Sequence, residues 1–196
     1  MISAYIKYLL EDQKEIWTVK KKQWIVVDLK DVDEDIRTHL WEMYQKTYGT
    51  QTGEHGLSLD NYKSMNELLD KYKLCWLIDV DQDPDPDAFI IYKDMPAGNK
   101  KISLLGSDRS EAGKRVLLDK LYELLKTHGW YIEASAKLED ICRTKGFNFV
   151  DDPEKVKQLI SGHKSKTMQW IGNGYYTRDL TNSNVKIKKR IYGLPN

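Results

Sequence analysis

The feature that most constrains the fold is the segment between residues 101 and 150, where two apolar runs flank a long amphipathic stretch. The first run, Ile102 to Leu105, leads into a short polar turn. Apolar residues then recur at helical spacing up to Gly129, which we expect to cap a helix at its C-terminus. A second apolar run, Trp130 to Ala134, follows. This alternation of strand and helix signals predicts an α/β fold with helices packed on a sheet.

The polar turn, Gly106 to Lys114, lies where the first strand passes into the helix. The first N–H groups of a helix lack acceptors within the helix, and the helix dipole is positive at that end. Such a start can therefore hold an anion, typically a phosphate. The alternative is an ordinary capped helix start, with Ser110 or Asp108 as the capping residue.

The order and spacing of this region resemble the GNAT superfamily of acyl-CoA-dependent N-acyltransferases. In that family, a strand is followed by Arg/Gln-x-x-Gly-x-Gly/Ala at a helix start, and a later short helix ends in a Gly-Phe pair. Here Arg109 falls on the first motif position, and Gly146-Phe147 falls on the terminal pair. The two motif glycines are replaced by Ala112 and Lys114, with Gly113 between them.

The resemblance implies a mixed, mostly antiparallel central sheet with helices on both faces. It also implies transfer of an acetyl group from acetyl-CoA to an amine acceptor, which is a small molecule or a protein, and a homodimer, as in many relatives. The implied cofactor contacts are Leu104, Leu105, Arg109, Ala112, Gly113 and Lys114.

Acyl transfer to an amine needs a base for the ammonium proton and an acid for the departing thiolate. The resemblance places Cys142 where many members have a tyrosine acid, four residues before Gly146. A buried Cys142 that acts only as a small hydrophobic residue is the alternative. Tyr131, Tyr175 and Tyr176 are further candidate acids. We take Glu133 as the candidate base, directly or through water, against the alternative of an exposed surface glutamate.

The chain has 196 residues and 40% hydrophobic content, which suits one domain over residues 1–196 with an N-terminal arm at 1–22. No apolar run approaches the ~20 residues that span a bilayer. The start lacks a secretory signal, so we expect a cytoplasmic protein without membrane contact. Cys75 and Cys142 are far apart, and the four histidines share no ligand spacing, so we expect no metal.

The basic residues concentrate at the end of the chain. Residues 155–196 hold nine Lys/Arg against one acid, Asp179, which leaves 22 basic and 29 acidic residues before them. This asymmetry favours an anionic ligand or partner near the C-terminal segment. Our second hypothesis is therefore a non-catalytic GNAT-like module that binds nucleic acid or an acidic protein through Lys186, Lys188, Lys189 and Arg190.

The other periodic segments complete the expected order of elements. We predict strands at 16–19, 24–27, 74–80, 88–92, 147–150, 168–171 and 187–192, with a polar loop between the last two. We predict helices from the acidic run 31–35 onward, over 62–72, 138–145 and 152–160, and a helix or arm at 2–10. We predict a flexible loop at 49–56, and the GNAT resemblance implies that this loop shapes the acceptor pocket. The aspartate-proline run 79–87 lacks the glycine of a calcium loop, so we predict a turn.

Overall fold

A computed structural model describes residues 16–19, 22–28, 34–48, 67, 72–79, 83–108, 110–134, 136–160, 168–179 and 186–196. The chain divides into two compact units, Met1–Lys93 with Ser103–Tyr122 and Asp94–Ile102 with Glu123–Asn196. The predicted segments 2–10 and 49–56, and nearly all of 62–72, lie outside the described residues. None of the described helices is long and apolar enough to cross a membrane.

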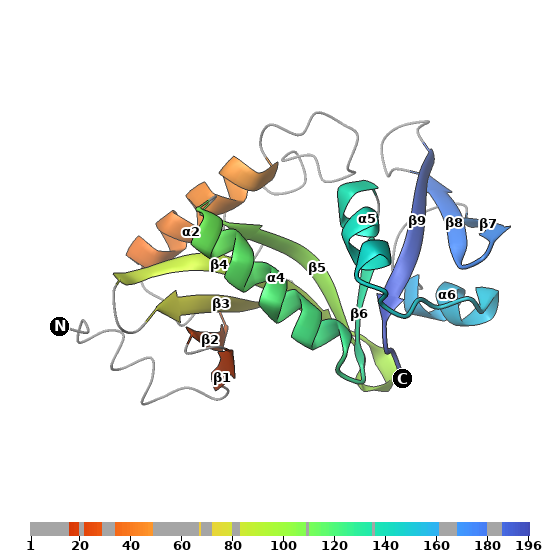
Figure 1. The fold of residues 1–196 in the computed structure, drawn as a ribbon, viewed down its shortest axis with the longest axis horizontal. Helices are drawn as coiled ribbons and strands as arrows, with labels where there is room; N and C mark the ends of the chain where they lie inside the picture. The colour runs from red at the N-terminus through yellow and green to blue at the C-terminus, as the bar shows by residue number, and fades with distance from the viewer. Residues whose placement is uncertain are drawn as a thin grey trace. The chain divides into compact units, whose positions relative to one another are not determined.

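The first unit contains an antiparallel meander followed by the second half of β5 (Figure 1). Its strands are β1 (Ile16–Val19), β2 (Lys22–Val27), β3 (Lys73–Asp79), β4 (Asp83–Asp94) and β5 (Lys100–Ser107). Its helices are α2 (Glu34–Tyr48) and most of α4 (Glu111–Leu125). The strands at 16–19, 24–27 and 74–80 were predicted within one to two residues.

Helix α2 forms for the reasons that its sequence indicates. Glu34 and Asp35 lie in its first turn, where carboxylates favour the positive end of the helix dipole. The residues predicted to form its buried face are all buried in the structure: Ile36, Leu40, Met43 and Tyr44. The period-3.6 pattern therefore predicted this helix and its core face correctly.

Strand β4 is covered on both faces. Its residues Ala88 to Tyr92 are each at most 1% exposed, although successive side chains of a strand point to opposite faces. The predicted turn over 79–87 is wrong for residues 83–87, which form the start of β4. Pairing of β3 with Pro86 and Asp83 is accommodated by register shifts at Ile78, which explains how a strand containing proline can pair there.

In the second unit, the start of β5 pairs in parallel with β6 (Trp130–Ala134) from Lys100↔Trp130 to Ile102↔Ile132. The other pairings are antiparallel and follow the order β6-β9-β8-β7. These strands are β7 (Met168–Gly172), β8 (Tyr175–Asp179) and β9 (Lys186–Gly193). The helices are α5 (Ala136–Thr144) and α6 (Pro153–Ile160).

Helix α6 supplies apolar residues to one face of this sheet. The Asp152 carboxylate caps the helix by accepting from the N–H groups of Glu154 and Lys155, as the predicted cap requires. The Tyr131 hydroxyl donates to the Leu159 carbonyl at 2.9 Å, which fixes the end of α6 over β6. The core cluster on this face is Tyr131, Val150, Val156, Leu159, Ile160, Tyr176 and Ile191.

Three predictions in the second half of the chain need correction. The polar loop between the last strands contains β8, which follows a tight turn with positive φ at Asn173 and Gly174. Residues 147–150 form only an isolated bridge, Phe149↔Tyr192, because they pass β9 at one point. Helix α4 ends at Leu125, so Gly129 does not cap it but starts the entry into β6 with φ of 84°.

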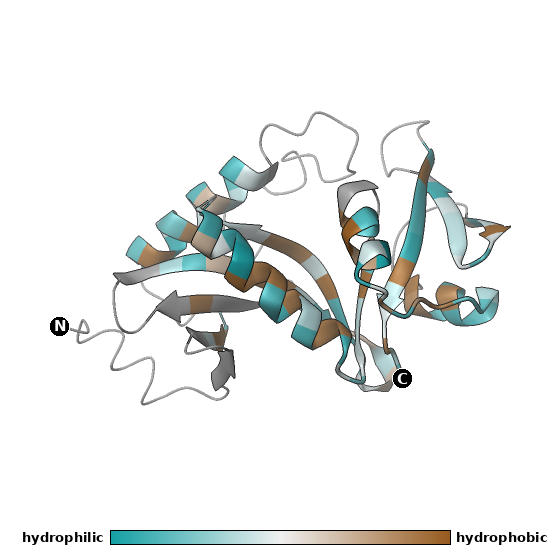
Figure 2. Ribbon diagram, viewed as in Figure 1, coloured by the Kyte–Doolittle hydropathy of each residue, from teal (hydrophilic) through white to brown (hydrophobic). Residues whose placement is uncertain are grey.

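The fold class is the expected one, a mixed α/β fold with a mostly antiparallel sheet and helices. Figure 2 shows hydrophobic and hydrophilic residues interleaved along α4, as the amphipathic pattern predicted. Leu117, Leu121, Leu124 and Leu125 of its predicted stripe are buried, and Val116 is half-buried. From β2 to α5 the described elements run strand, helix, three strands, helix, strand, helix. The order that the GNAT resemblance implies has a second helix after the first, at 62–72, of which only residues 67 and 72 are described.

Candidate functional site

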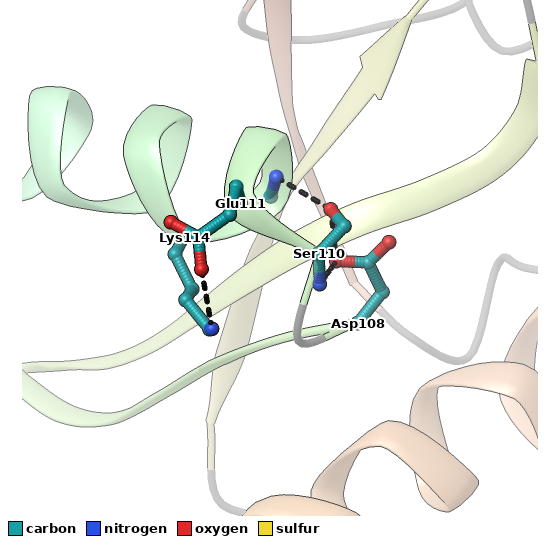
Figure 3. Close-up of polar contacts among 5 residues, drawn as sticks. Asp108, Ser110, Glu111 and Lys114 are labelled. Atoms are coloured by element: carbon teal, nitrogen blue, oxygen red, sulfur yellow. Dashed lines mark hydrogen bonds and ion pairs between the residues drawn. The ribbon is translucent and has the colours of Figure 1, made fainter.

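The start of α4 is closed by a local network of hydrogen bonds in the first unit (Figure 3). The N–H of Gly113 donates to Ser110 Oγ at 2.8 Å, which makes Ser110 the helix cap. The Ser110 N–H and hydroxyl both donate to Asp108 Oδ1, at 2.9 and 2.8 Å. The Asp108 N–H donates to the Asp87 carbonyl at 2.9 Å. The alternative of a capped helix start is therefore confirmed in its geometry.

Gly113 is required here by close approach of other atoms. A Cβ at this position would lie 2.2 Å from Asp108 Oδ1 and 2.8 Å from the Asp87 carbonyl oxygen. The chain itself thus fills the space beside Gly113. The Asp108 carboxylate occupies the position at the helix start where the dipole favours negative charge.

The remaining predicted cofactor residues surround this start. Ala112 is exposed, and Lys114 is exposed and pairs with Glu111 at 2.9 Å between Nζ and Oε1. Leu104 is buried and Leu105 half-buried on β5. Arg109 lies outside the described residues.

A pyrophosphate would fit this start after one side-chain movement. The N–H groups of Glu111 and Ala112 belong to the first turn, which has no acceptors within the helix. Asp108 and Ser110 are exposed, so the Asp108 carboxylate can rotate away from Ser110 at a cost of about 1 kcal/mol for each hydrogen bond lost. Without that movement, like charges would oppose the phosphate.

Glu133 is not an exposed surface residue, because its side chain is only 4% exposed. Its Oε2 lies 2.7 Å from Lys101 Nζ, and its Oε1 lies 2.9 Å from Arg178 Nε. Burial alone would raise the pKa of Glu133, but the charges of Lys101, Lys189 and Arg178 outweigh it and hold the pKa well below its usual range. A carboxylate held so strongly in its ionised form is a weak base.

Cys142 is fully buried on α5. Burial, and to a smaller extent the Glu139 carboxylate, raises the pKa of its thiol to about 12. A thiol in this environment stays protonated and contacts no solvent. These surroundings are those of a small hydrophobic residue, the alternative given above.

Tyr175 and Tyr176 are successive residues of β8 and therefore point to opposite faces of the sheet. The Tyr175 hydroxyl donates to Glu139 Oε1 at 2.8 Å, and this bond, with burial, raises its pKa. Tyr176 is fully buried, and burial and the nearby Glu133 raise its pKa further. The structure thus places Glu133 with Tyr176, and Cys142 with Tyr175 near Glu139, in two separate groups.

Glu139 was not predicted as a site residue, and Arg190 was predicted only as part of a basic surface. Glu139 accepts hydrogen bonds from both Tyr175 and Tyr192, the latter at 3.1 Å. Arg190 stacks on the rings of Phe149 and Tyr175, with its Cζ 3.5 and 4.0 Å from their centroids. The period of two along β9 was the available signal that Lys189, which shares a face with Ile187 and Ile191, points away from the face of Lys186 and Lys188.

The burial of individual residues along β9 changes the basic-surface hypothesis. Lys186 and Lys188 are exposed, but Lys189 and Arg190 are buried, so only the first two present charge to a partner. Lys188 Nζ lies 3.8 Å from the centre of the Tyr175 ring. Within the described residues, no group of three or more His, Cys, Asp or Glu side chains could hold a metal ion.

No protein-family model matches the sequence, and neither does any curated protein. Among solved structures, a protein of Desulfovibrio desulfuricans assigned to the GNAT family of acetyltransferases is 16% identical, with a TM-score of 0.45. The match covers 89% of this chain and 98% of that one. At this similarity it carries no argument about function, and the fold class rests on the described strands and helices.

Proposed function

We propose that the protein is an acyl-CoA-dependent N-acyltransferase that binds the pyrophosphate of acetyl-CoA at the start of α4. The observation that carries the proposal is the exposed helix start directly after β5, a strand whose first residues run parallel to β6. In the GNAT resemblance, this strand-turn-helix unit holds the cofactor. The acceptor would be an amine on a small molecule or a protein.

The chain's own groups would act by binding and orientation. The N–H groups of Glu111 and Ala112 would donate to phosphate oxygens, and Lys114 Nζ would turn from Glu111 toward the added negative charge. Asp108 would have to rotate out of the helix start. Bound acetyl-CoA would supply the activated thioester. The positive groups around Glu133 oppose the binding of an ammonium group and make the Glu133 carboxylate a weak base, which argues against Glu133 as the residue that takes the ammonium proton.

Calorimetric titration with acetyl-CoA tests the proposal. We expect saturable binding that weakens roughly tenfold in Lys114→Ala, the usual effect of one charge-assisted hydrogen bond. We expect Arg109→Ala to weaken it as well, and Asp108→Asn to strengthen it, because an amide keeps the cap and removes the like charge. Lys126→Ala, an exposed lysine beyond the other end of α4, is the matched control. No binding of wild type at millimolar acetyl-CoA would rule the proposal out.

The Asp108 carboxylate at the helix start favours a second candidate, a non-catalytic module that uses exposed basic residues of its C-terminal segment. This candidate predicts that acetyl-CoA never binds, even to Asp108→Asn. It also predicts that nucleic acid or an acidic protein binds with a steep salt dependence. The double variant Lys186→Ala/Lys188→Ala should lose this binding, while Lys93→Ala/Lys126→Ala should keep it. Salt-independent binding would argue against it.

A further inference from the structure

Charged side chains from four strands meet on one face of the sheet in the second unit. Lys101 of β5 stands opposite Tyr131, two residues before Glu133 on β6. Lys189 of β9 stands opposite Tyr176, two residues before Arg178 on β8. Because side chains separated by two residues share a face, strand pairing brings these charged groups together around Glu133.

Among the described residues, this group holds more cations than carboxylates. Three cations, Lys101, Arg178 and Lys189, surround one carboxylate, Glu133. The side chains of Lys101 and Arg178 are 6% and 18% exposed, and Lys189 as a residue is 8% exposed. Buried charge without compensation is costly, so the two cations that have no further contact among the described residues, Arg178 and Lys189, are the feature to explain.

The second unit does not supply a further carboxylate from its remaining segments. Residues 135, 161–167 and 180–185 contain no Asp or Glu, so their placement cannot add a carboxylate. Asp179, the residue after Arg178, stands opposite Lys186 in the β8–β9 register.

Two of the cations have donors to spare. Arg178 contacts Glu133 through Nε, and within the described residues its two terminal nitrogens make no hydrogen bond or ion pair. Lys189 Nζ likewise has no hydrogen bond or ion pair with any residue that the structure describes. Burial lowers the pKa of Lys189 to about 8. Repulsion from Arg178 and Lys101 also lowers this pKa, whereas the attraction of Glu133 raises it.

We propose that this face of the second unit binds an oxyanion, a carboxylate or phosphate group, between the terminal nitrogens of Arg178 and Lys189 Nζ. The guanidinium fork suits the two oxygens of such a group, and the ammonium adds a third donor. Glu133 and Lys101 position Arg178 and do not contact the ligand. The added negative charge offsets the positive charges of Arg178 and Lys189.

Thermal unfolding in the presence of inorganic phosphate or succinate, with sodium chloride at equal ionic strength as reference, tests this proposal. We expect at least one oxyanion to raise the Tm of wild type at tens of millimolar, beyond the effect of chloride. A response to phosphate alone identifies a phosphate site, and a response to succinate alone identifies a carboxylate site. No response to either beyond that to chloride would overturn the proposal.

Two variants of neighbouring residues on β9 locate the effect. Lys189→Met should abolish the oxyanion response, whereas Lys188→Met, an exposed lysine, should keep it in full. Arg178→Lys should weaken binding roughly tenfold, because it keeps the charge but loses the fork. Equal stabilisation of wild type and Lys189→Met would contradict the proposed site.

A measurement on wild type alone keeps the test valid if a variant does not fold. The Nζ of Lys189, followed by NMR, should titrate at higher pH when the oxyanion is bound, because a nearby negative charge favours the ammonium form. An unchanged titration in saturating phosphate and in saturating succinate would count against binding at Lys189. Calorimetry with acetyl-CoA on Lys189→Met separates this site from the start of α4, since only the latter should bind that cofactor.

Discussion

The start of α4 and the charged face around Glu133 differ in how their charged side chains are compensated. At the α4 start, one carboxylate, Asp108, meets backbone N–H groups and the positive end of a helix within a few residues. Around Glu133, three cations from distant parts of the chain share one carboxylate away from water. The first arrangement is local, exposed and satisfied, whereas the second is long-range and buried and, among the described residues, holds more cations than carboxylates. Substitutions in the two regions should therefore differ in size and in pH dependence.

The largest effect should follow removal of the Glu133 carboxylate from the buried group. Glu133→Gln removes the negative charge that lies against Lys101 and Arg178 and should lower the free energy of unfolding by about 3–5 kcal/mol, measured by urea denaturation. Glu154→Gln, which breaks an exposed pair with Lys157, is the matched control and should cost under about 1 kcal/mol. Equal losses of stability in the two variants would contradict a larger contribution of the buried group than of an exposed ion pair.

The pH dependence of Lys189 comes next. Its pKa is about 8 in the folded chain and 10.5 when unfolded, so the unfolded chain binds more protons between these values. Stability of wild type relative to Lys189→Met should therefore rise with pH across this window, by about 3 kcal/mol in total, and stay level below it. Glu133, Lys101, Arg178 and Tyr176 face this amine and are present in both proteins. Urea unfolding at several pH values gives the difference, and a flat difference would contradict the depressed pKa.

A smaller loss should follow Gly113→Ala. Alanine normally favours a helix over glycine by about 1 kcal/mol. Here its Cβ would meet the Asp108 carboxylate and the Asp87 carbonyl, so we expect a net loss of about 1–2 kcal/mol from overpacking. The double variant Gly113→Ala/Asp108→Ala removes one of the two contacts and should lose less than the sum of the single changes. Additive losses would show that the Asp108 carboxylate does not clash with a Cβ at position 113.

The smallest effect should be loss of the cap itself. Ser110→Ala removes the acceptor of the Gly113 N–H and should cost about 1 kcal/mol in thermal or urea unfolding. Lys114→Ala, which breaks only an exposed pair with Glu111, should cost less than half of that. If Ser110→Ala costs nothing, water replaces the cap, and the α4 start is easier to open to a ligand than its geometry indicates.

Sequence reasoning was accurate where neighbouring residues determine the structure. The cap at Asp152, the buried face of α2 and the helix start at Ser110 or Asp108 each depend on residues within a few positions of one another. Strand β8 was also within reach, because Asn173-Gly174 is a strong signal for a two-residue hairpin turn.

The charged face could not be predicted, because it depends on strand register. Residues 101, 133, 178 and 189 come together only after β5, β6, β9 and β8 have paired, and one residue of slippage would place each side chain on the other face. For the same reason, the sequence could not show that Glu133 is buried. The roles predicted for Glu133, Cys142, Tyr175 and Tyr176 remain predictions.

Because Cys142 is completely buried, its reactivity reports local opening of the structure around α5. A thiol without solvent contact and with a pKa of about 12 reacts with alkylating reagents only when α5 transiently detaches. In a Cys75→Ser background, the rate of labelling under native conditions therefore measures how often this helix opens. Comparing that rate with the rate of global unfolding would show whether α5 opens by local unfolding or only when the whole second unit unfolds.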